Sequence, residues 1–215
     1  MKGVYLVTDR QLCGSRGVEA TVSEAVRGGA AWVQLREKTA TTREFIKTAL
    51  RLKTLLAPLR VPLLINDRVD VAQAAGADGV HLGQDDMPWA YARQILGPDA
   101  IIGLSVETWA DVEAAQDQDI DYLGVSPIYA TPTKTDTKAA WGLDGLSRIR
   151  SFSRHPLVAI GGIDADNAAR VVHAGTDCIA VVSAICAAPD PFAATRKLCE
   201  TIEIAIENRG TWSEI

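Results

Sequence analysis

No stretch of this sequence of 215 residues is apolar for long enough to cross a membrane. The longest apolar runs, such as residues 62–65, have the length of a strand, whereas a membrane-spanning helix needs roughly 18 apolar residues or more. The N-terminal segment also lacks a long apolar stretch followed by small residues, which is the pattern of an export signal. We therefore expect neither a membrane partner nor secretion.

Cysteine is scarce, and its spacing gives no sign of a metal site. The chain has four cysteines, Cys13, Cys178, Cys186 and Cys199, and no two of them form a C-x-x-C pair. Because disulfides are rare where the cell keeps thiols reduced, we interpret these residues as free thiols of a cytoplasmic protein.

An excess of basic residues is also missing. Lysine and arginine number 22 against 27 acidic residues, which gives a net charge of -5. Since a nucleic-acid binder usually presents a basic face, we expect no nucleic-acid partner. The hydrophobic fraction of 47% and the charged fraction of 23% are those of a globular protein. The length suits one core, so we expect a single domain over residues 1–215.

What the sequence does contain is a repeated alternation of short apolar runs and longer segments with helical periodicity. The apolar runs cover residues 3–7, 32–35, 63–65, 79–82, 101–104, 122–125, 157–160 and 178–182. They lack strict polar alternation, as expected of parallel strands covered on both faces, and segments such as 42–56 and 167–174 have helical spacing. Eight such units predict a (β/α)8 TIM barrel, with a doubly wound open sheet as the competing architecture.

Two connections are long for this architecture, residues 9–20 after the first strand and 126–141 after the sixth. We expect both to be loops at the face formed by the carboxyl ends of the strands, where barrel enzymes carry their chemistry.

Residues at the ends of the second to eighth expected strands, or just beyond them, supply many polar groups. They are Gln34, Arg36, Glu37, Lys38, Asn66, Asp67, His81, Gln84, Asp85, Asp86, Ser105, Glu107, Thr131, Thr133, Lys134, the pair Gly161-Gly162 and Ser183. Together they offer cations, carboxylates, hydroxyls and a glycine pair. This set suits a phosphorylated ligand bound with magnesium.

The glycine pair and the end of the eighth strand predict a phosphate site. Backbone N–H groups at Gly161-Gly162 can approach a phosphate closely, and Val182-Ser183 adds a hydroxyl and a further N–H. Barrels often build a phosphate site from the loops after strands seven and eight. The plainer alternative is that the two glycines only form a turn.

Asp67 and Asp86 follow consecutive strands, so a barrel brings them together and makes them candidate Mg²⁺ ligands. Either residue could instead cap the following helix, and Asp86 before Met87-Pro88 fits a cap. On composition alone Asp85 is an equally good carboxylate.

The basic residues and the histidine have plain alternatives as well. Arg36 and Lys38 alternate, so both can point to one side of an extended segment, or they can pair with Glu37 in solvent. Lys134 lies either in a lid over the ligand or in an ordinary surface loop. We expect His81 to be a strand-end residue bonded to a carbonyl, with a direct catalytic role as the alternative. No pairing of the Ser-His-Asp or Cys-His kind is apparent.

Seven segments in this order resemble the thiamine-phosphate synthase family, and the resemblance covers nearly the whole chain. They are YLVTD (5–9), QLREK (34–38), LINDR (64–68), GVHLGQDD (79–86), GLS (103–105), PIYATPTK (127–134) and AIGGI (159–163). One departure is Ser126, where the family pattern has glycine.

The resemblance implies a transferase that condenses 4-amino-2-methyl-5-hydroxymethylpyrimidine diphosphate with a thiazole ethyl or carboxyethyl phosphate, giving thiamine phosphate and pyrophosphate. It implies that Asp67 and Asp86 bind Mg²⁺, and that Arg36, Lys38, Ser105 and Lys134 are catalytic. The residues implied for the pyrimidine diphosphate are Gln34, Leu35, Arg36, Glu37, Lys38, Asn66, Ser105 and Lys134. Those implied for the thiazole phosphate are Thr131, Pro132, Thr133, Gly162, Val182 and Ser183.

The residue chemistry fits a dissociative reaction. A diphosphate on a benzylic-type carbon can depart before attack, and this step needs cations near the leaving group rather than a protein nucleophile. Two rivals stay open: a thiazole tautomerase of the same fold and a non-catalytic barrel that binds phosphorylated ligands. The partners expected are small phosphorylated molecules, and whether the chain forms a homo-oligomer stays open.

Overall fold

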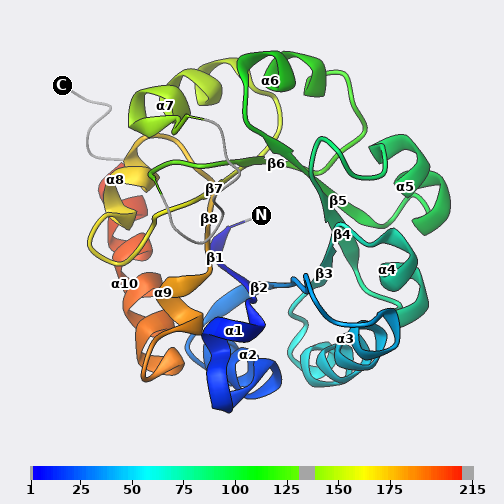
Figure 1. Cartoon of the computed structure of the whole chain (residues 1–215). Coiled ribbons are helices and arrows are strands. Elements are labelled where there is room, and N and C mark those ends of the chain that lie inside the picture. Colours follow the sequence, from blue (N-terminus) through cyan, green and yellow to red (C-terminus); the bar gives the residue numbers. More distant parts are fainter. Residues whose placement is uncertain (1, 131–138, 210–215) are drawn as a thin grey trace.

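The computed structural model describes residues 2–130 and 139–209. In this part of the chain eight parallel strands form one closed barrel in sequence order, and β8 closes the ring by pairing with β1 (Figure 1). The strands are β1 Gly3–Val7, β2 Ala30–Leu35, β3 Leu63–Asn66, β4 Gly79–Leu82, β5 Ile101–Val106, β6 Tyr122–Val125, β7 Leu157–Ile160 and β8 Cys178–Val181. The predicted TIM barrel is confirmed, and the open sheet is excluded.

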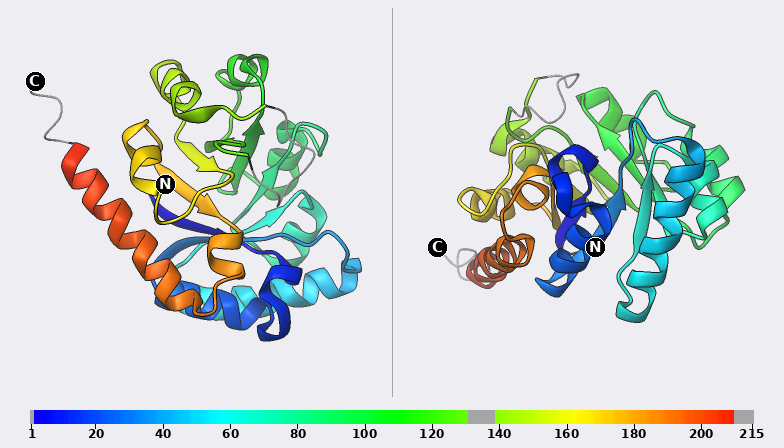
Figure 2. Two further views of the ribbon diagram at one scale, coloured as in Figure 1. Left: turned by 60° about the vertical axis from the view of Figure 1, so that its left-hand side comes forward. Right: turned by 60° about the horizontal axis from the view of Figure 1, so that its bottom comes forward.

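Helices surround the barrel and connect consecutive strands (Figures 1 and 2). They are α1 Arg10–Cys13, α2 Val18–Arg27, α3 Thr42–Leu56, α4 Val69–Ala75, α5 Trp89–Leu96, α6 Trp109–Ala115, α7 Gly142–Phe152, α8 Ala168–His173, α9 Ser183–Cys186 and α10 Pro191–Arg209, with 3-10 turns η1 Gly14–Arg16 and η2 Ala57–Leu59. The long α10 packs against α8 and α2 and covers the outside of β1. The helix predicted over residues 42–56 is α3, which begins with a capping box between Thr41 and Glu44.

The prediction of a loop over residues 9–20 is wrong. This connection folds into α1 and η1, and α2 already begins at Val18. The physical reason lies in Asp9, whose side chain accepts the N–H groups of Gln11 and Leu12 at 3.0 and 3.1 Å. A carboxylate that satisfies these otherwise unpaired donors starts a helix directly after the strand.

The second long connection, residues 126–141, is tied together at its base. The carbonyl of Pro127 accepts the N–H of Trp141 at 2.9 Å, and the carbonyl of Ile128 accepts that of Gly142 at 3.0 Å. Residues 131–138, between these two ends, lie outside the described part of the chain.

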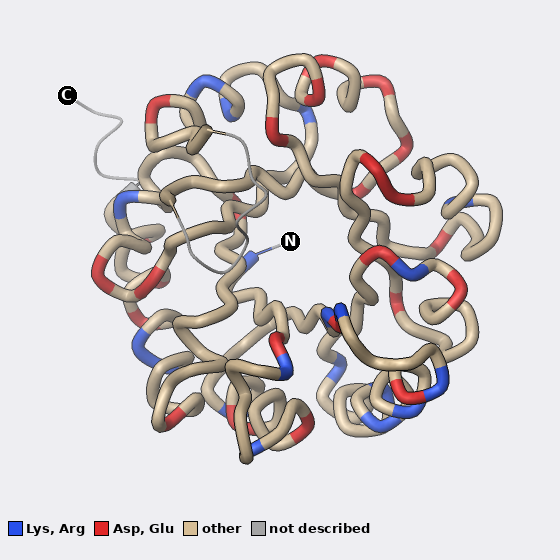
Figure 3. Tube along the Cα trace, viewed as in Figure 1, with Lys and Arg blue, Asp and Glu red and all other residues tan. Residues whose placement is uncertain are grey.

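Alternate residues of each strand face the inside and the outside of the barrel. One set packs in the barrel interior and includes Tyr5, Leu64, Tyr122, Val158 and Ala180. Their immediate neighbours along the strands pack outward against the helices, in a larger apolar layer. Charged residues lie on the helices and connections around the strands (Figure 3). The eight strands contain no aspartate, glutamate, lysine or arginine.

The same polar contact, which we call a strand anchor, joins three pairs of neighbouring strands where they begin. The aspartate just before β4, β6 or β8 accepts an N–H at the start of β3, β5 or β7, respectively, at 2.8 Å each time. Each carboxylate also pairs with a cation from a neighbouring helix. The three sets are Asp78 with Leu63 and Lys53, Asp121 with Ile102 and Arg93, and Asp177 with Leu157 and Arg150.

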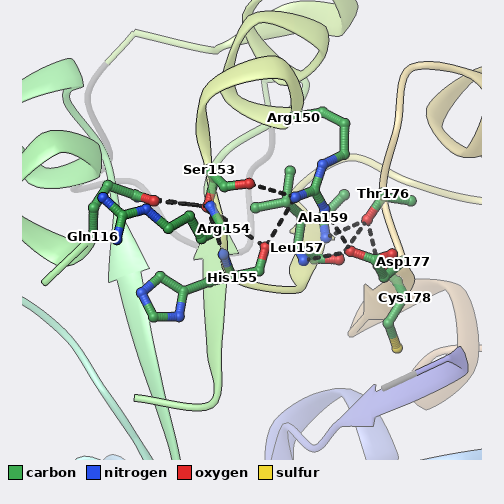
Figure 4. Close-up of polar contacts among 10 residues, drawn as sticks. All are labelled: Gln116, Arg150, Ser153, Arg154, His155, Leu157, Ala159, Thr176, Asp177 and Cys178. Atoms are coloured by element: carbon green, nitrogen blue, oxygen red, sulfur yellow. Dashed lines mark hydrogen bonds and ion pairs between the residues drawn. The ribbon is translucent and has the colours of Figure 1, made fainter. Parts of the chain in front are cut away.

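Figure 4 shows the third of these anchors in detail. Arg150 contacts Asp177 at 2.9 Å and also donates to the carbonyls of Ser153 and His155. Thr176 donates to a main-chain carbonyl and accepts the N–H of Ala159 at 3.1 Å. Since these contacts lie where β7 and β8 begin, at the end of the barrel opposite the carboxyl ends, we assign them to stability rather than to a site.

The four cysteines are free. Among the described helices, none is both long and apolar enough to span a bilayer.

Candidate active site

The carboxyl ends of the strands enclose a pocket of about 480 Å³ to which all eight strands contribute. It collects ten of the sixteen residues that the family resemblance implies for the site, namely Gln34, Arg36, Lys38, Asn66, Asp67, Asp86, Ser105, Gly162, Val182 and Ser183. The other residues singled out at the strand ends that line it are His81, Gln84, Asp85, Glu107 and Gly161. Thr131, Pro132, Thr133 and Lys134 lie outside the described residues. The strand ends and the residues just after them therefore bring separate parts of the sequence around one cavity.

Leu35 and Glu37 do not line this pocket. Leu35 is fully buried in the apolar layer between strands and helices. Glu37 forms an ion pair with Arg10 at 2.7 Å, and its side chain is 1% exposed. Because side chains alternate along an extended segment, Gln34, Arg36 and Lys38 share the pocket side, and the two residues between them point away.

The two cations of this segment pair with aspartates of other segments. Lys38 Nζ lies 2.7 Å from Asp67 Oδ2, and Arg36 Nη1 lies 3.3 Å from Asp9 Oδ2. The alternative in which both cations pair with Glu37 in solvent is therefore wrong. Asp67 has φ of 62°, an uncommon conformation for a residue other than glycine, and its N–H donates to the carbonyl of His81 at 2.9 Å.

Asp86 closes the turn after β4 rather than capping a helix. Its Oδ2 accepts the N–H of Gly83 at 2.7 Å, and neither α4 nor α5 has a side-chain cap. Burial, and then the nearby Asp67 carboxylate, raise the pKa of Asp86, while the Gly83 N–H and Lys38 oppose this shift. The Asp67 and Asp86 carboxylates therefore influence each other's charge in the pocket.

The glycine pair lies where the connection after β6 crosses the end of β7. Gly161 and Gly162 have φ of 106° and 66°, and a Cβ on Gly162 would lie 2.8 Å from Cβ of Tyr129. The N–H of Tyr129 donates to the carbonyl of Gly161 at 3.0 Å. The pair thus forms a turn whose backbone lines the pocket, and the phosphate site stays a prediction.

The floor of the pocket carries a chain of hydrogen bonds that crosses the barrel. Gln34 Nε2 donates to Tyr5 Oη at 2.9 Å, and Tyr5 Oη lies 3.1 Å from Tyr122 Oη. Tyr122 Oη lies 2.9 Å from His81 Nδ1, and His81 Nε2 lies 2.8 Å from Ser105 Oγ. We refer to these five residues as the polar chain. His81 therefore bonds to two hydroxyls and not to a carbonyl as expected.

The structure thus brings a serine and a histidine together, although no such pair was apparent in the sequence. The third member of the row is Tyr122, which stands where a serine hydrolase has a carboxylate. Burial raises the pKa of Tyr122, and also that of Tyr5, well above the ordinary value for tyrosine. Both phenols are therefore neutral near pH 7, and no negative charge faces His81 from this side.

Sequence reasoning gave Tyr5 and Tyr122 no role, because it considered only polar residues at the strand ends and just beyond them. The signal that could have found them is the alternation inside the strands. Tyr5 lies two residues before the inward-facing Val7, and Tyr122 lies two residues before the inward-facing Gly124.

A model of the family described as thiamine monophosphate synthase matches residues 4–185 of this chain. The chain belongs to this family. Among curated relatives, thiamine-phosphate synthase of Albidiferax ferrireducens is 56% identical over 93% of this chain and 91% of its own length. The synthase of Chloroflexus aurantiacus is 50% identical over 95% and 94%.

Solved structures agree with this family membership. Thiamine phosphate pyrophosphorylase from Pyrococcus furiosus aligns with a TM-score of 0.87 and 39% identity, covering 95% of this chain and 96% of that one. Phosphoribosyl anthranilate isomerase from Thermotoga maritima aligns with a TM-score of 0.68 at 17% identity, and this likeness concerns the fold alone. The predicted family is confirmed, and with it the predicted class of enzyme, a thiamine-phosphate synthase and transferase of thiamine biosynthesis.

Proposed function

We propose that this pocket condenses hydroxymethylpyrimidine diphosphate with a thiazole phosphate, and that pyrophosphate departs before the thiazole attacks. The observation that carries the proposal is the division of the pocket: Arg36, Lys38 and two carboxylates gather after β2 to β4, and the exposed glycine backbone lies across the barrel after β7. One end suits a diphosphate and the other suits a second, smaller phosphate.

At the diphosphate end, Arg36 and Lys38 supply positive charge and Asn66 supplies an amide. Both cations are held by aspartates at 3.3 and 2.7 Å, so they are positioned before a ligand arrives. Charge that is already in place stabilises a departing anion without reorganisation during the reaction. Lys134, outside the described residues, is proposed to add a further cation.

Asp67 and Asp86 are proposed to hold Mg²⁺. Both carboxylates line the same pocket, and the effect of Asp67 on the pKa of Asp86 is consistent with their lying near each other. Hard oxygen ligands of this kind suit magnesium. Two protein carboxylates are enough, since magnesium usually takes its other ligands from substrate phosphates and water. When bound there, Mg²⁺ would neutralise charge on the diphosphate.

The bond changes balance without a protein nucleophile. The C–O bond to the diphosphate breaks with its electron pair, which leaves a pyrimidine cation and pyrophosphate. The thiazole nitrogen then forms the new C–N bond with its lone pair, and the positive charge ends on the thiazolium ring. Gln34 and Ser105 orient the pyrimidine, while Gly162 with Val182-Ser183 holds the thiazole phosphate. Positioning of the two reactants is the main task of the protein.

The direct test is to incubate the protein with both substrates and Mg²⁺ and to measure thiamine phosphate and pyrophosphate. Equal amounts of the two products are expected, with no product in excess chelator. A tautomerase would instead isomerise the thiazole phosphate alone, and a non-catalytic binding protein would bind both ligands without turnover. Product formation undiminished in excess chelator would contradict the magnesium assignment.

The order of bond changes needs a separate test. Replacing the pyrimidine methyl group by trifluoromethyl withdraws electrons and destabilises the cation, so turnover should fall by several orders of magnitude. Binding of this analogue should change much less, because its shape and diphosphate contacts persist. A turnover close to that of the natural substrate would show that the thiazole displaces the diphosphate directly.

A further inference from the structure

The polar chain consists of side chains from five strands that meet inside the barrel. Gln34 comes from β2, Tyr5 from β1, Tyr122 from β6, His81 from β4 and Ser105 from β5. The two tyrosines are each 1% exposed and Gln34 is 4% exposed. In such surroundings each polar group needs a partner, so the direction of each hydrogen bond is strongly constrained.

Two glycines make room for the chain. A Cβ on Gly103 of β5 would overlap the ring of Tyr122, and a Cβ on Gly124 of β6 would lie 2.8 Å from Cε1 of His81. The two rings are stacked, with centroids 5.5 Å apart and planes 20° apart. The inner faces of β5 and β6 are therefore shaped to accept these two rings.

The direction of the chain follows from giving each buried hydrogen an acceptor. The amide Nε2 of Gln34 carries only hydrogens, so it donates to Tyr5 Oη. The distances from Tyr5 to Tyr122 and from Tyr122 to His81 fit either donor. Because a buried hydroxyl hydrogen needs an acceptor, we assign the hydrogen of Tyr5 to Tyr122 Oη and that of Tyr122 to His81 Nδ1. With Nδ1 accepting, a neutral His81 ring carries its hydrogen on Nε2 and donates to Ser105 Oγ.

We propose that Tyr5, Tyr122 and His81 are positioning residues which hold Ser105 as a hydrogen-bond donor toward the pocket. With Oγ already accepting from His81, the hydroxyl hydrogen of Ser105 is free for the ligand. In this direction His81 cannot act as a base toward Ser105, so the pair is not an activated nucleophile. A donor at Ser105 selects an accepting ring nitrogen, and only this identification of the ligand rests on the proposed function.

The first test measures the histidine tautomer in the ligand-free protein, which does not depend on any activity. Nitrogen-15 NMR of histidine-labelled protein reports which ring nitrogen carries the hydrogen. The sequence has three histidines, and His81→Asn identifies the signals of His81 by their loss. We expect the Nε2–H tautomer near pH 7. The Nδ1–H tautomer would overturn the proposal even if the protein forms thiamine phosphate.

The second test separates positioning of the pyrimidine from binding of the diphosphate. Tyr122→Phe should weaken binding of hydroxymethylpyrimidine diphosphate about tenfold and leave the affinity for inorganic pyrophosphate unchanged. Tyr5→Phe keeps the contact of Tyr122 with His81 and should have a smaller effect, which provides a second variant if Tyr122→Phe folds poorly. Tyr91→Phe is the matched control, because Tyr91 lies on α5, is 61% exposed and does not line the pocket.

Calorimetry with each ligand decides between the outcomes. Unchanged affinity for the pyrimidine diphosphate in both pocket variants would overturn the positioning role. Equal losses for the diphosphate and for inorganic pyrophosphate would also overturn it, since they would show a general disturbance of the pocket. If the wild-type tautomer is Nε2–H but no thiamine phosphate forms, the direction of the chain stands and the proposed function fails.

Discussion

Gly103→Ala should destabilise the protein through a single contact inside the barrel. The new Cβ would overlap Cζ, Cε1 and Oη of Tyr122. Carbon atoms that are not bonded to each other settle about 3.5–4.0 Å apart, so the ring would have to move by roughly 1 Å or more. Tyr122 Oη lies 3.1 Å from Tyr5 Oη and 2.9 Å from His81 Nδ1, and a shift of this size breaks at least one of these bonds.

The expected loss combines two costs. Overpacking of a well-filled interior costs about 1–3 kcal/mol, and a buried hydroxyl left without its partner costs about 1–3 kcal/mol. We therefore expect Gly103→Ala to lower the free energy of unfolding by about 3 kcal/mol. Urea unfolding followed by tryptophan fluorescence measures this value for the wild type and the variant.

A double-mutant cycle with Tyr122→Ala tests the stated cause. Once the ring is absent, the alanine at position 103 has nothing to overlap, so its cost should fall below about 0.5 kcal/mol, which is the range of ordinary additivity. An equal loss in both backgrounds would refute the reasoning, because it would place the cost in the backbone of β5 and not in the contact with Tyr122.

Three further predictions concern the site, an anchor and a helix cap. Asp86→Asn keeps an acceptor for the Gly83 N–H but loses the charge, so turnover in a product assay should fall at least about tenfold, or ~1.4 kcal/mol, with the melting temperature little changed. Asp177→Asn loses the ion pair with Arg150, which is about one-third exposed, so urea unfolding should show a loss of about 1 kcal/mol after allowance for solvent screening. Hydrogen bonds from Thr41 lower the pKa of Glu44. Wild type should therefore be more stable than Glu44→Gln at every pH above the ordinary glutamate pKa, and this advantage should vanish as pH falls through the lowered pKa of Glu44. Unfolding of both proteins as a function of pH measures the difference.

Strand positions were the part of the fold that the sequence predicted best, and the physical reason is local. A parallel strand buried on both faces must be almost wholly apolar, and all eight apolar runs became strands of the barrel. The extent of α3 was equally readable, since helical spacing over residues 42–56 is a local pattern, and the structure adds the capping box of Thr41 and Glu44 at its start. The loop expected over residues 9–20 was wrong because one aspartate side chain, Asp9, was enough to start α1.

In the candidate site, too, the sequence predicted local orientation but not contacts between distant segments. Arg36 and Lys38 share one side because alternation in an extended segment is a local property, and the same rule turns Leu35 and Glu37 away from the pocket. The sequence did not predict the partners of these cations, because the 2.7 Å contact of Lys38 with Asp67 joins segments about thirty residues apart. The alternative of a helix cap at Asp86 is wrong for a local reason, since its carboxylate accepts the N–H of Gly83, three residues earlier, and closes its own turn.

The sequence by itself determined the barrel, the strand ends that carry the polar residues, and the family, because strand periodicity and motif order are properties of neighbouring residues. Only the tertiary structure decided which side chains meet. Tyr5 and Tyr122 are 117 residues apart and their hydroxyls lie 3.1 Å apart, a contact that closure of the ring creates and that no local pattern encodes. The direction that we propose for the hydrogen bonds from Gln34 to Ser105 depends on that contact, and therefore on closure of the barrel.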